Sequence, residues 1–138
     1  MSANVNAADN RPILLLLARV FIAALFLVAG TRKLLTYAAT VGYMAKLGFP
    51  VPEAAAAISI VIEIGASLML LTGWRTRWAA WILVVFVVVA TAMAHRFWQF
   101  EPAQFANQLN HFLKNIAIIG GLIFVAIFGP GRMALDKG

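Results

Sequence analysis

Glu63 is the side chain of this sequence whose type and position point most directly to chemistry. It stands in the apolar run from Ala54 to Gly73, about the 20 residues that a bilayer crossing needs, and no other residue of that run is charged. A carboxylate at membrane depth costs several kcal/mol unless it is protonated, paired or wetted. Such groups mark proton relays, ion pathways and ligand sites, so we expect Glu63 to have a partner on another apolar run.

Arg19, which interrupts the first apolar run, is the predicted partner of Glu63. From the rise of about 1.5 Å per residue, Arg19 would lie roughly 10 Å and Glu63 roughly 15 Å from the same membrane boundary, and the two side chains can bridge that difference. Ser59 and Ser67 stand four residues before and after Glu63 and would support the pair from one helical face. The sequence leaves open whether this buried ion pair serves a reaction or only locks two helices together.

A second group of polar residues is predicted at the opposite membrane face, where the first and third runs end and the fourth begins. The candidate ligand or quinone site there consists of Lys33, His95, His111, Lys114 and Asn115. Imidazoles, an amide and cations suit an anion, a carboxylate or a quinone carbonyl, and His titrates near neutral pH, which allows proton transfer. The alternative is that the cations reach lipid headgroups and that the histidines are ordinary interface residues. No carboxylate has ligand spacing to either His, so we predict no metal site and disfavour haem.

The apolar runs that position these residues predict an all-α transmembrane four-helix bundle. Hydrophobic residues make up 63% of the 138 residues and charged residues 12%, about half the charged fraction of a soluble domain. We predict spans at about 12–35, 52–73, 78–98 and 112–129 within one domain, 12–136, after a flexible N-terminal segment, 1–11. The stretches 36–53 and 95–110, which overlap the neighbouring span ends by a few residues, are read as connections, the first because Gly48 to Pro52 breaks any helix.

Charge and composition narrow the localisation and exclude several kinds of function. Four spans place both termini on one side, and the basic residues divide five against five between the two sides, so the positive-inside rule does not decide the topology. The short turn with Arg75 and Arg77 favours cytoplasmic termini. The net charge of +6 lies mostly at span ends, where it anchors helices, so no nucleic-acid partner is expected. Because Cys is absent, disulfides and thiol redox chemistry of this chain are excluded.

A series of short motifs runs in order from about residue 13 to residue 136. The first span reads Arg19-Val-Phe-Ile-Ala-Ala-Leu-Phe-Leu-Val-Ala-Gly30 and closes with Lys33-Leu34. After it come Gly48-Phe49-Pro50, Glu63, Gly73 with the Arg75/Arg77 turn, Lys114-Asn115 with Gly120-Gly121, and Gly129-Pro130-Gly131-Arg132 with Leu135-Asp136. In this order the motifs resemble those of the DoxX family of small integral membrane proteins.

The resemblance implies a four-helix bundle in the inner membrane of the cell. Members of the DoxX family have been associated with terminal quinol oxidation, thiosulfate:quinone oxidoreduction and oxidative-stress complexes. By motif match, the resemblance implicates six positions here: Arg19, Gly30, Lys33, Glu63, Lys114 and Asn115. The family offers no agreed catalytic set to carry over, so whether the chain is an enzyme stays open.

Three functions are open at this point. The first is a small redox-associated subunit that interacts with quinone or with a partner oxidoreductase, which the resemblance and the polar group around His95 and His111 favour. The second is a transporter for a small solute or a proton, because Glu63 lies at membrane depth; with four spans it would need an oligomer. The third is a non-catalytic structural or assembly subunit in which the ion pair only fixes the fold. The expected partners are the lipid bilayer, oxidoreductase subunits and further copies of the chain, and quinone is the ligand left open.

Overall fold

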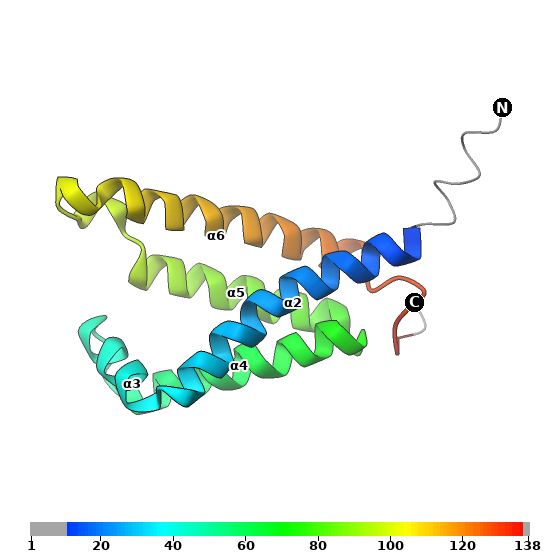
Figure 1. Ribbon diagram of the computed structural model, residues 1–138, viewed down its shortest axis with the longest axis horizontal. Coiled ribbons are helices and arrows are strands. Elements are labelled where there is room, and N and C mark those ends of the chain that lie inside the picture. The colour runs from blue at the N-terminus through cyan, green and yellow to red at the C-terminus, as the bar shows by residue number, and fades with distance from the viewer. Residues whose placement is uncertain (1–10, 137–138) are drawn as a thin grey trace.

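The computed structural model describes residues 11–136, and within that range it contains helices and no strands (Figure 1). Helices α2 (Arg11–Leu35), α4 (Pro52–Thr72), α5 (Thr76–Ala94) and α6 (Pro102–Phe128) are the four in this range that are long and apolar enough to cross a membrane. Two short helices, α3 (Tyr37–Lys46) and η1 (Phe97–Gln99), lie in the connections. The prediction of an all-α bundle with four spans is confirmed. Apart from Arg11, the segment predicted to be flexible lies outside the described residues.

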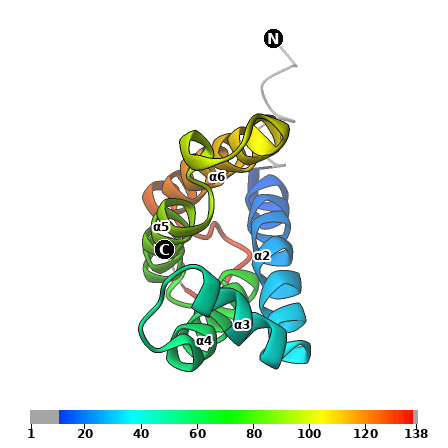
Figure 2. The ribbon, with the colours of Figure 1, turned by 90° about the vertical axis from the view of Figure 1, so that its left-hand side faces the viewer.

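The bundle consists of two helix pairs that are joined at one end. α2 packs against α4, α5 packs against α6, and the tight turn Gly73–Arg75 connects α4 to α5. α2 begins and the C-terminal tail lies at this joined end, which we call the tail end (Figure 1). α2 and α6 share few contacts, and the two pairs diverge towards the other end, where α3 crosses in front of the bundle (Figure 2). We call this the α3 end.

The interior is packed with small and aliphatic side chains, and the outer faces are apolar as well. Ala23, Ala79, Ala80, Leu70 and Leu83 have no exposed surface. Outward-pointing residues such as Phe21, Val61 and Phe124 are 71%, 70% and 65% exposed. Since these exposed side chains are apolar on the membrane-spanning helices, the surface that surrounds the bundle contacts lipid.

Two connections are more helical than the sequence indicated. α3 fills most of the stretch 36–53, because the backbone hydrogen bonds of α2 continue through Thr36: its N–H bonds the carbonyl of Arg32, and the N–H of Thr40 bonds the carbonyl of Thr36. The break at Gly48 is present, but it follows a helix. α6 begins at Pro102 rather than near residue 112, because Pro suits the first turn of a helix. The prediction placed the start too late because the first turns of α6 are polar and have low hydropathy.

The tail that follows α6 is fastened to the turn between α4 and α5. The N–H of Leu135 donates to the carbonyl of Thr72 at 3.0 Å, and the N–H of Asp136 donates to the carbonyl of Gly73 at 2.9 Å. The Asp136 carboxylate in turn accepts a hydrogen bond of 3.0 Å from the N–H of Thr76. Because Thr76 is the first residue of α5, the tail caps a helix that has no side-chain cap of its own.

Candidate functional site

Glu63 is paired with Lys33 in the structure. The Lys33 Nζ atom lies 2.8 Å from each carboxylate oxygen of Glu63, and this is the one salt bridge among residues 11–136. The Glu63 side chain is 4% exposed, whereas the Lys33 side chain is 30% exposed. The predicted Arg19–Glu63 pair is therefore not formed. Glu63 pairs instead with Lys33, which was predicted to belong to the polar group at the opposite membrane face.

A close approach between α2 and α4 sets this pairing. A Cβ atom on Gly30 would lie 2.9 Å from the Glu63 Cβ and 2.8 Å from the Ile64 Cγ1, so the backbone of α2 crosses the middle of α4 at this glycine. Lys33 follows Gly30 by one turn and reaches Glu63. Arg19 precedes Gly30 by about 16 Å along the axis of α2, at a rise of about 1.5 Å per residue, and so lies far from Glu63. The depth estimate was wrong because it started both helices at one membrane boundary, while α2 extends past α4 at the tail end (Figure 1).

Arg19 fastens the tail instead. It is 1% exposed, and its Nη2 donates to the carbonyl oxygen of Met133. A Cβ on Gly73 would collide with the Arg19 guanidinium and with Ala134, so the absence of a side chain at Gly73 makes room for both. Among the described residues, Arg19 Nε and Nη1 have no hydrogen-bond partner. The guanidinium thus links α2 to the tail and to the end of α4.

The two serines that flank Glu63 are both buried but have different surroundings. The Ser67 hydroxyl donates to the backbone carbonyl of Glu63 and does not reach its carboxylate. The Ser59 hydroxyl, on a residue that is 5% exposed, has no hydrogen-bond partner within the described part of the chain. A buried hydroxyl without a partner is costly, so Ser59 marks a place where another molecule can supply the missing hydrogen bond.

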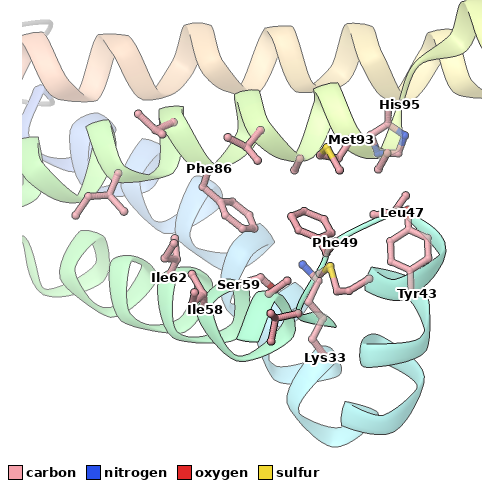
Figure 3. Close-up of a pocket in the computed structure, with 18 of the residues that line it drawn as sticks. Lys33, Tyr43, Leu47, Phe49, Ile58, Ser59, Ile62, Phe86, Met93 and His95 are labelled. Atoms are coloured by element: carbon pink, nitrogen blue, oxygen red, sulfur yellow. The ribbon is translucent and has the colours of Figure 1, made fainter. Parts of the chain in front are cut away.

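Ser59 lies on the wall of a groove of about 860 Å³ between α4 and α5, which we call the α4–α5 groove (Figure 3). α3 and the segment after it close the groove at the α3 end. Its lining is mostly apolar, and Ile58 and Val85 on its two long sides are 58% and 62% exposed, so it opens towards lipid. The polar side chains of the lining are Lys33, Tyr43, Ser59, Trp78, Trp81 and His95.

Lys33 and Ser59 present hydrogen-bond donors to one part of this groove. Two of the three N–H groups of the Lys33 ammonium donate to the Glu63 oxygens, and the third can donate to a further acceptor. The Nζ atom also lies 5.5 Å from the centroid of the Phe86 ring, so Lys33 reaches from α2 to the face of α5. Lys33, Ser59, Phe86 and Phe49 surround the same part of the groove (Figure 3).

His95 and His111 come together where α5 ends. Their rings stack with centroids 5.0 Å apart and planes inclined by 19°. The His95 Nδ1 atom is 2.9 Å from Gln108 Oε1, and Asn115 Nδ2 donates to Thr91 Oγ1 at 2.9 Å. Because an amide oxygen only accepts, the assigned Gln108 orientation places the proton of neutral His95 on Nδ1 and leaves Nε2 as an acceptor.

The polar group predicted for the α3 end is therefore divided in the structure. Lys33 and His95 line the α4–α5 groove, but at different places along it (Figure 3). His111 and Asn115 lie behind His95, between α5 and α6. Lys114 is exposed. No group of three or more His, Cys, Asp or Glu side chains in residues 11–136 is placed to hold a metal ion.

The groove itself was not foreseen from the sequence. Phe86 lies in the predicted span 78–98, and Phe49 lies in the predicted helix break, and neither position by itself indicates a groove. The motif Gly48-Phe49-Pro50 was a usable signal, because Gly permits the positive φ of a turn and Pro fixes its own φ, so that a large apolar side chain between them is typical of a defined loop.

Comparison with known proteins gives the groove a family context. A family model described as DoxX matches residues 14–96, a range that contains every residue lining the α4–α5 groove. The chain belongs to the DoxX family. It is 34% identical over 127 residues to the inner membrane protein YphA of Escherichia coli K12, covering 92% of this chain and 91% of YphA. It is also 34% identical over 124 residues to the inner membrane protein YqjF of the same organism, covering 88% of each protein.

A more distant relative matches a smaller part of the DoxX chain. The Surfeit locus protein 4 homolog of Schizosaccharomyces pombe is 25% identical over 79 residues, which are 56% of this chain and 26% of that protein. No solved structure matches the chain. This DoxX protein is thus a four-span membrane protein whose Escherichia coli relatives are inner membrane proteins.

Proposed function

We propose that this DoxX protein is a quinone-binding subunit of the inner membrane, which takes its ligand from the bilayer through the α4–α5 groove. One observation carries the proposal: a lipid-facing apolar groove of about 860 Å³ contains a lysine paired with a buried carboxylate, next to a buried serine hydroxyl that has no partner in residues 11–136. Sites for small lipophilic ligands have this composition, with an apolar wall and a few polar groups that fix orientation.

The residues of the groove fit the parts of a quinone. A ring carbonyl would accept hydrogen bonds from the free N–H of Lys33 and from the Ser59 hydroxyl. The ring would lie between Phe86 and Phe49, and the isoprenoid tail would follow the apolar face of α5 towards lipid. In this arrangement Lys33 and Ser59 bind and orient the ligand, while the redox chemistry belongs to the quinone.

The proposal includes a partner and a topology. Since the chain has no Cys, we propose that electrons are exchanged between the quinone and a partner oxidoreductase in the same membrane. We also propose that the tail end, with Arg75, Arg77 and Arg132, faces the cytoplasm, which is the orientation favoured by basic residues in short loops. The α3 end and its two histidines would then face the opposite side.

Tryptophan fluorescence provides a direct test. Trp78 and Trp81 line the groove, so a variant in which Trp74 and Trp98 are replaced by Phe keeps only the two reporters of the site. In nanodiscs of phosphatidylcholine, decylubiquinone should quench their emission with saturation. Ser59→Ala should weaken this binding about three- to tenfold, the usual effect of one lost hydrogen bond.

The matched control is Ser67→Ala, which removes the other serine hydroxyl that flanks Glu63, eight residues after Ser59 on α4. Ser67 bonds its own helix and does not line the groove, so its replacement should leave the binding of decylubiquinone unchanged. Quenching that rises linearly without saturation, or that Ser59→Ala and Ser67→Ala affect equally, would reject the proposed site.

A further inference from the structure

We infer that Glu63 is a specificity-determining residue: by neutralising Lys33 it excludes anionic amphiphiles from the α4–α5 groove and reserves the groove for neutral, carbonyl-bearing ones. This inference rests on the proposed function and deepens it. The motivating feature is the charge balance of the site. Lys33 is the only Lys, Arg, Asp or Glu residue in the lining, so one ion pair sets the formal charge that these residues present to a ligand.

A lone ammonium in this position would attract the wrong ligands. The groove opens towards lipid, where fatty acids and phospholipids carry anionic heads on apolar chains. Hydrogen bonds between an ammonium and a carboxylate or phosphate are about twice as strong as those between neutral groups. Without Glu63, Lys33 would therefore hold an acidic amphiphile in preference to a neutral one.

Glu63 removes that preference because its charge is close and poorly screened. Both of its oxygens lie 2.8 Å from the Lys33 Nζ, and its side chain is 4% exposed. An anionic head brought to Lys33 would face a second negative charge across a short distance in a medium of low dielectric, which is repulsive. Specificity of this kind comes from a built-in repulsive element as well as from attraction to the correct ligand.

A neutral carbonyl keeps the attractive contacts without this repulsion. It can accept from the remaining N–H of Lys33 and from the Ser59 hydroxyl, which lacks any other partner in the described residues. The other titratable side chains of the lining, His95 and Tyr43, lie towards the α3 end of the groove, away from Lys33 (Figure 3). Neither of them forms a hydrogen bond or a salt bridge with Lys33 or Glu63.

Competition in the unmodified groove provides the first test. The Trp78/Trp81 reporter protein, with decylubiquinone bound in phosphatidylcholine nanodiscs, is titrated with methyl palmitate or with hexadecanesulfonate, which stays anionic at all working pH values. Concentrations are expressed as mole fraction in lipid. Methyl palmitate should displace the quinone at a concentration at least about tenfold lower than the sulfonate does. Equal displacement, or better displacement by the sulfonate, overturns the inference.

The Glu63→Gln variant provides the second test, read as the ratio of the two displacing concentrations. This ratio should shift by about tenfold or more towards the sulfonate, because the ammonium is no longer neutralised. The double variant Lys33→Met/Glu63→Gln has neither charge and should show no such shift. A Glu63→Gln protein that folds but keeps the wild-type ratio would mean that the pair only locks α2 to α4. If that variant does not fold, the wild-type competition still decides.

The two proposals fail in different ways. If wild-type protein shows no saturable decylubiquinone binding, the quinone proposal is wrong. If it binds decylubiquinone and Ser59→Ala weakens that binding, but the ester and the sulfonate compete equally, the groove is a quinone site and only the role of Glu63 as a specificity residue is wrong.

Discussion

Removing one partner of the Lys33–Glu63 pair should destabilise the protein more than removing both. Lys33→Met leaves a carboxylate that is 4% exposed without its counter-charge, and Glu63→Gln leaves an ammonium without its own. Breaking a buried pair in this way costs about 3–5 kcal/mol, because an uncompensated charge stays in a medium that solvates it poorly. The double variant has no such charge.

The magnitude follows from the geometry. At a separation of 2.8 Å and an effective dielectric constant of about 20, the gross attraction is about 6 kcal/mol, of which the desolvation of Glu63 cancels a large part. We expect each single change to cost about 3 kcal/mol and the double change about 2 kcal/mol. The coupling energy would then be about 4 kcal/mol, within the range measured for close charge pairs.

The assay is a double-mutant cycle on the free energy of unfolding. The four proteins are unfolded reversibly in mixed micelles with increasing SDS, and helix content is followed by circular dichroism. Arg19→Met combined with Glu63→Gln is the control cycle, because Arg19 bonds the tail and not Glu63. These two changes should add within about 0.5 kcal/mol.

Two results would refute the reasoning. Additive losses for Lys33 and Glu63 would show that the pair contributes no coupling. Strong coupling between Arg19 and Glu63 would show that the helices are offset differently from the structure and that the pairing expected from depth alone was right.

Two further changes test the packing of α2 and the tail. Gly30→Ala should lower the free energy of unfolding by about 1–3 kcal/mol, because its Cβ would lie 2.8 Å from a carbon of Ile64; Gly120→Ala, which meets nothing within 4 Å, is the matched control and should be near neutral in the same SDS titration. Hydrogen bonds from the N–H group of Thr76 and, to a smaller extent, of Arg75 lower the pKa of Asp136 below its ordinary 3.8. The ionised carboxylate therefore contributes its full stabilisation above pH 3.8, and this stabilisation is lost as the pH falls through the lowered pKa. The melting temperature of wild type should therefore drop more than that of Asp136→Asn below about pH 4, and parallel curves for the two proteins would contradict this role.

Much of the fold could be predicted from hydropathy and helix-end signals. The buried residues of α2 are Arg19, Ala23, Phe26 and Gly30, which is the stripe that a period of 3.6 residues selects. The start of α6 was missed because its first turns are polar, although Pro102 is a valid start signal. α3 was missed because a helix break at Gly48 says nothing about the residues before it.

The site was only partly predictable, because it depends on the offset between helices. Periodicity indicates which residues share a face, but it does not say how far one helix slides along another. That offset is set here by the close contact at Gly30, and it brings Lys33 to Glu63 and leaves Arg19 at the tail end. Gly30 was visible in the sequence as a small residue one turn before a cation. Predicting the α4–α5 groove would also require the angle between the two helix pairs, because the groove arises where these pairs diverge.

The fastening of the tail has a consequence for the order in which the molecule is assembled. Met133 and Asp136, which bond Arg19 and cap α5 at Thr76, follow all four membrane spans in the chain. A ribosome delivers α2, α4, α5 and α6 to the membrane before these residues emerge. Until then, the Arg19 guanidinium lacks its carbonyl and α5 lacks its cap. The contacts that hold the tail end together therefore depend on residues 133–136 and form only once that segment has been synthesised.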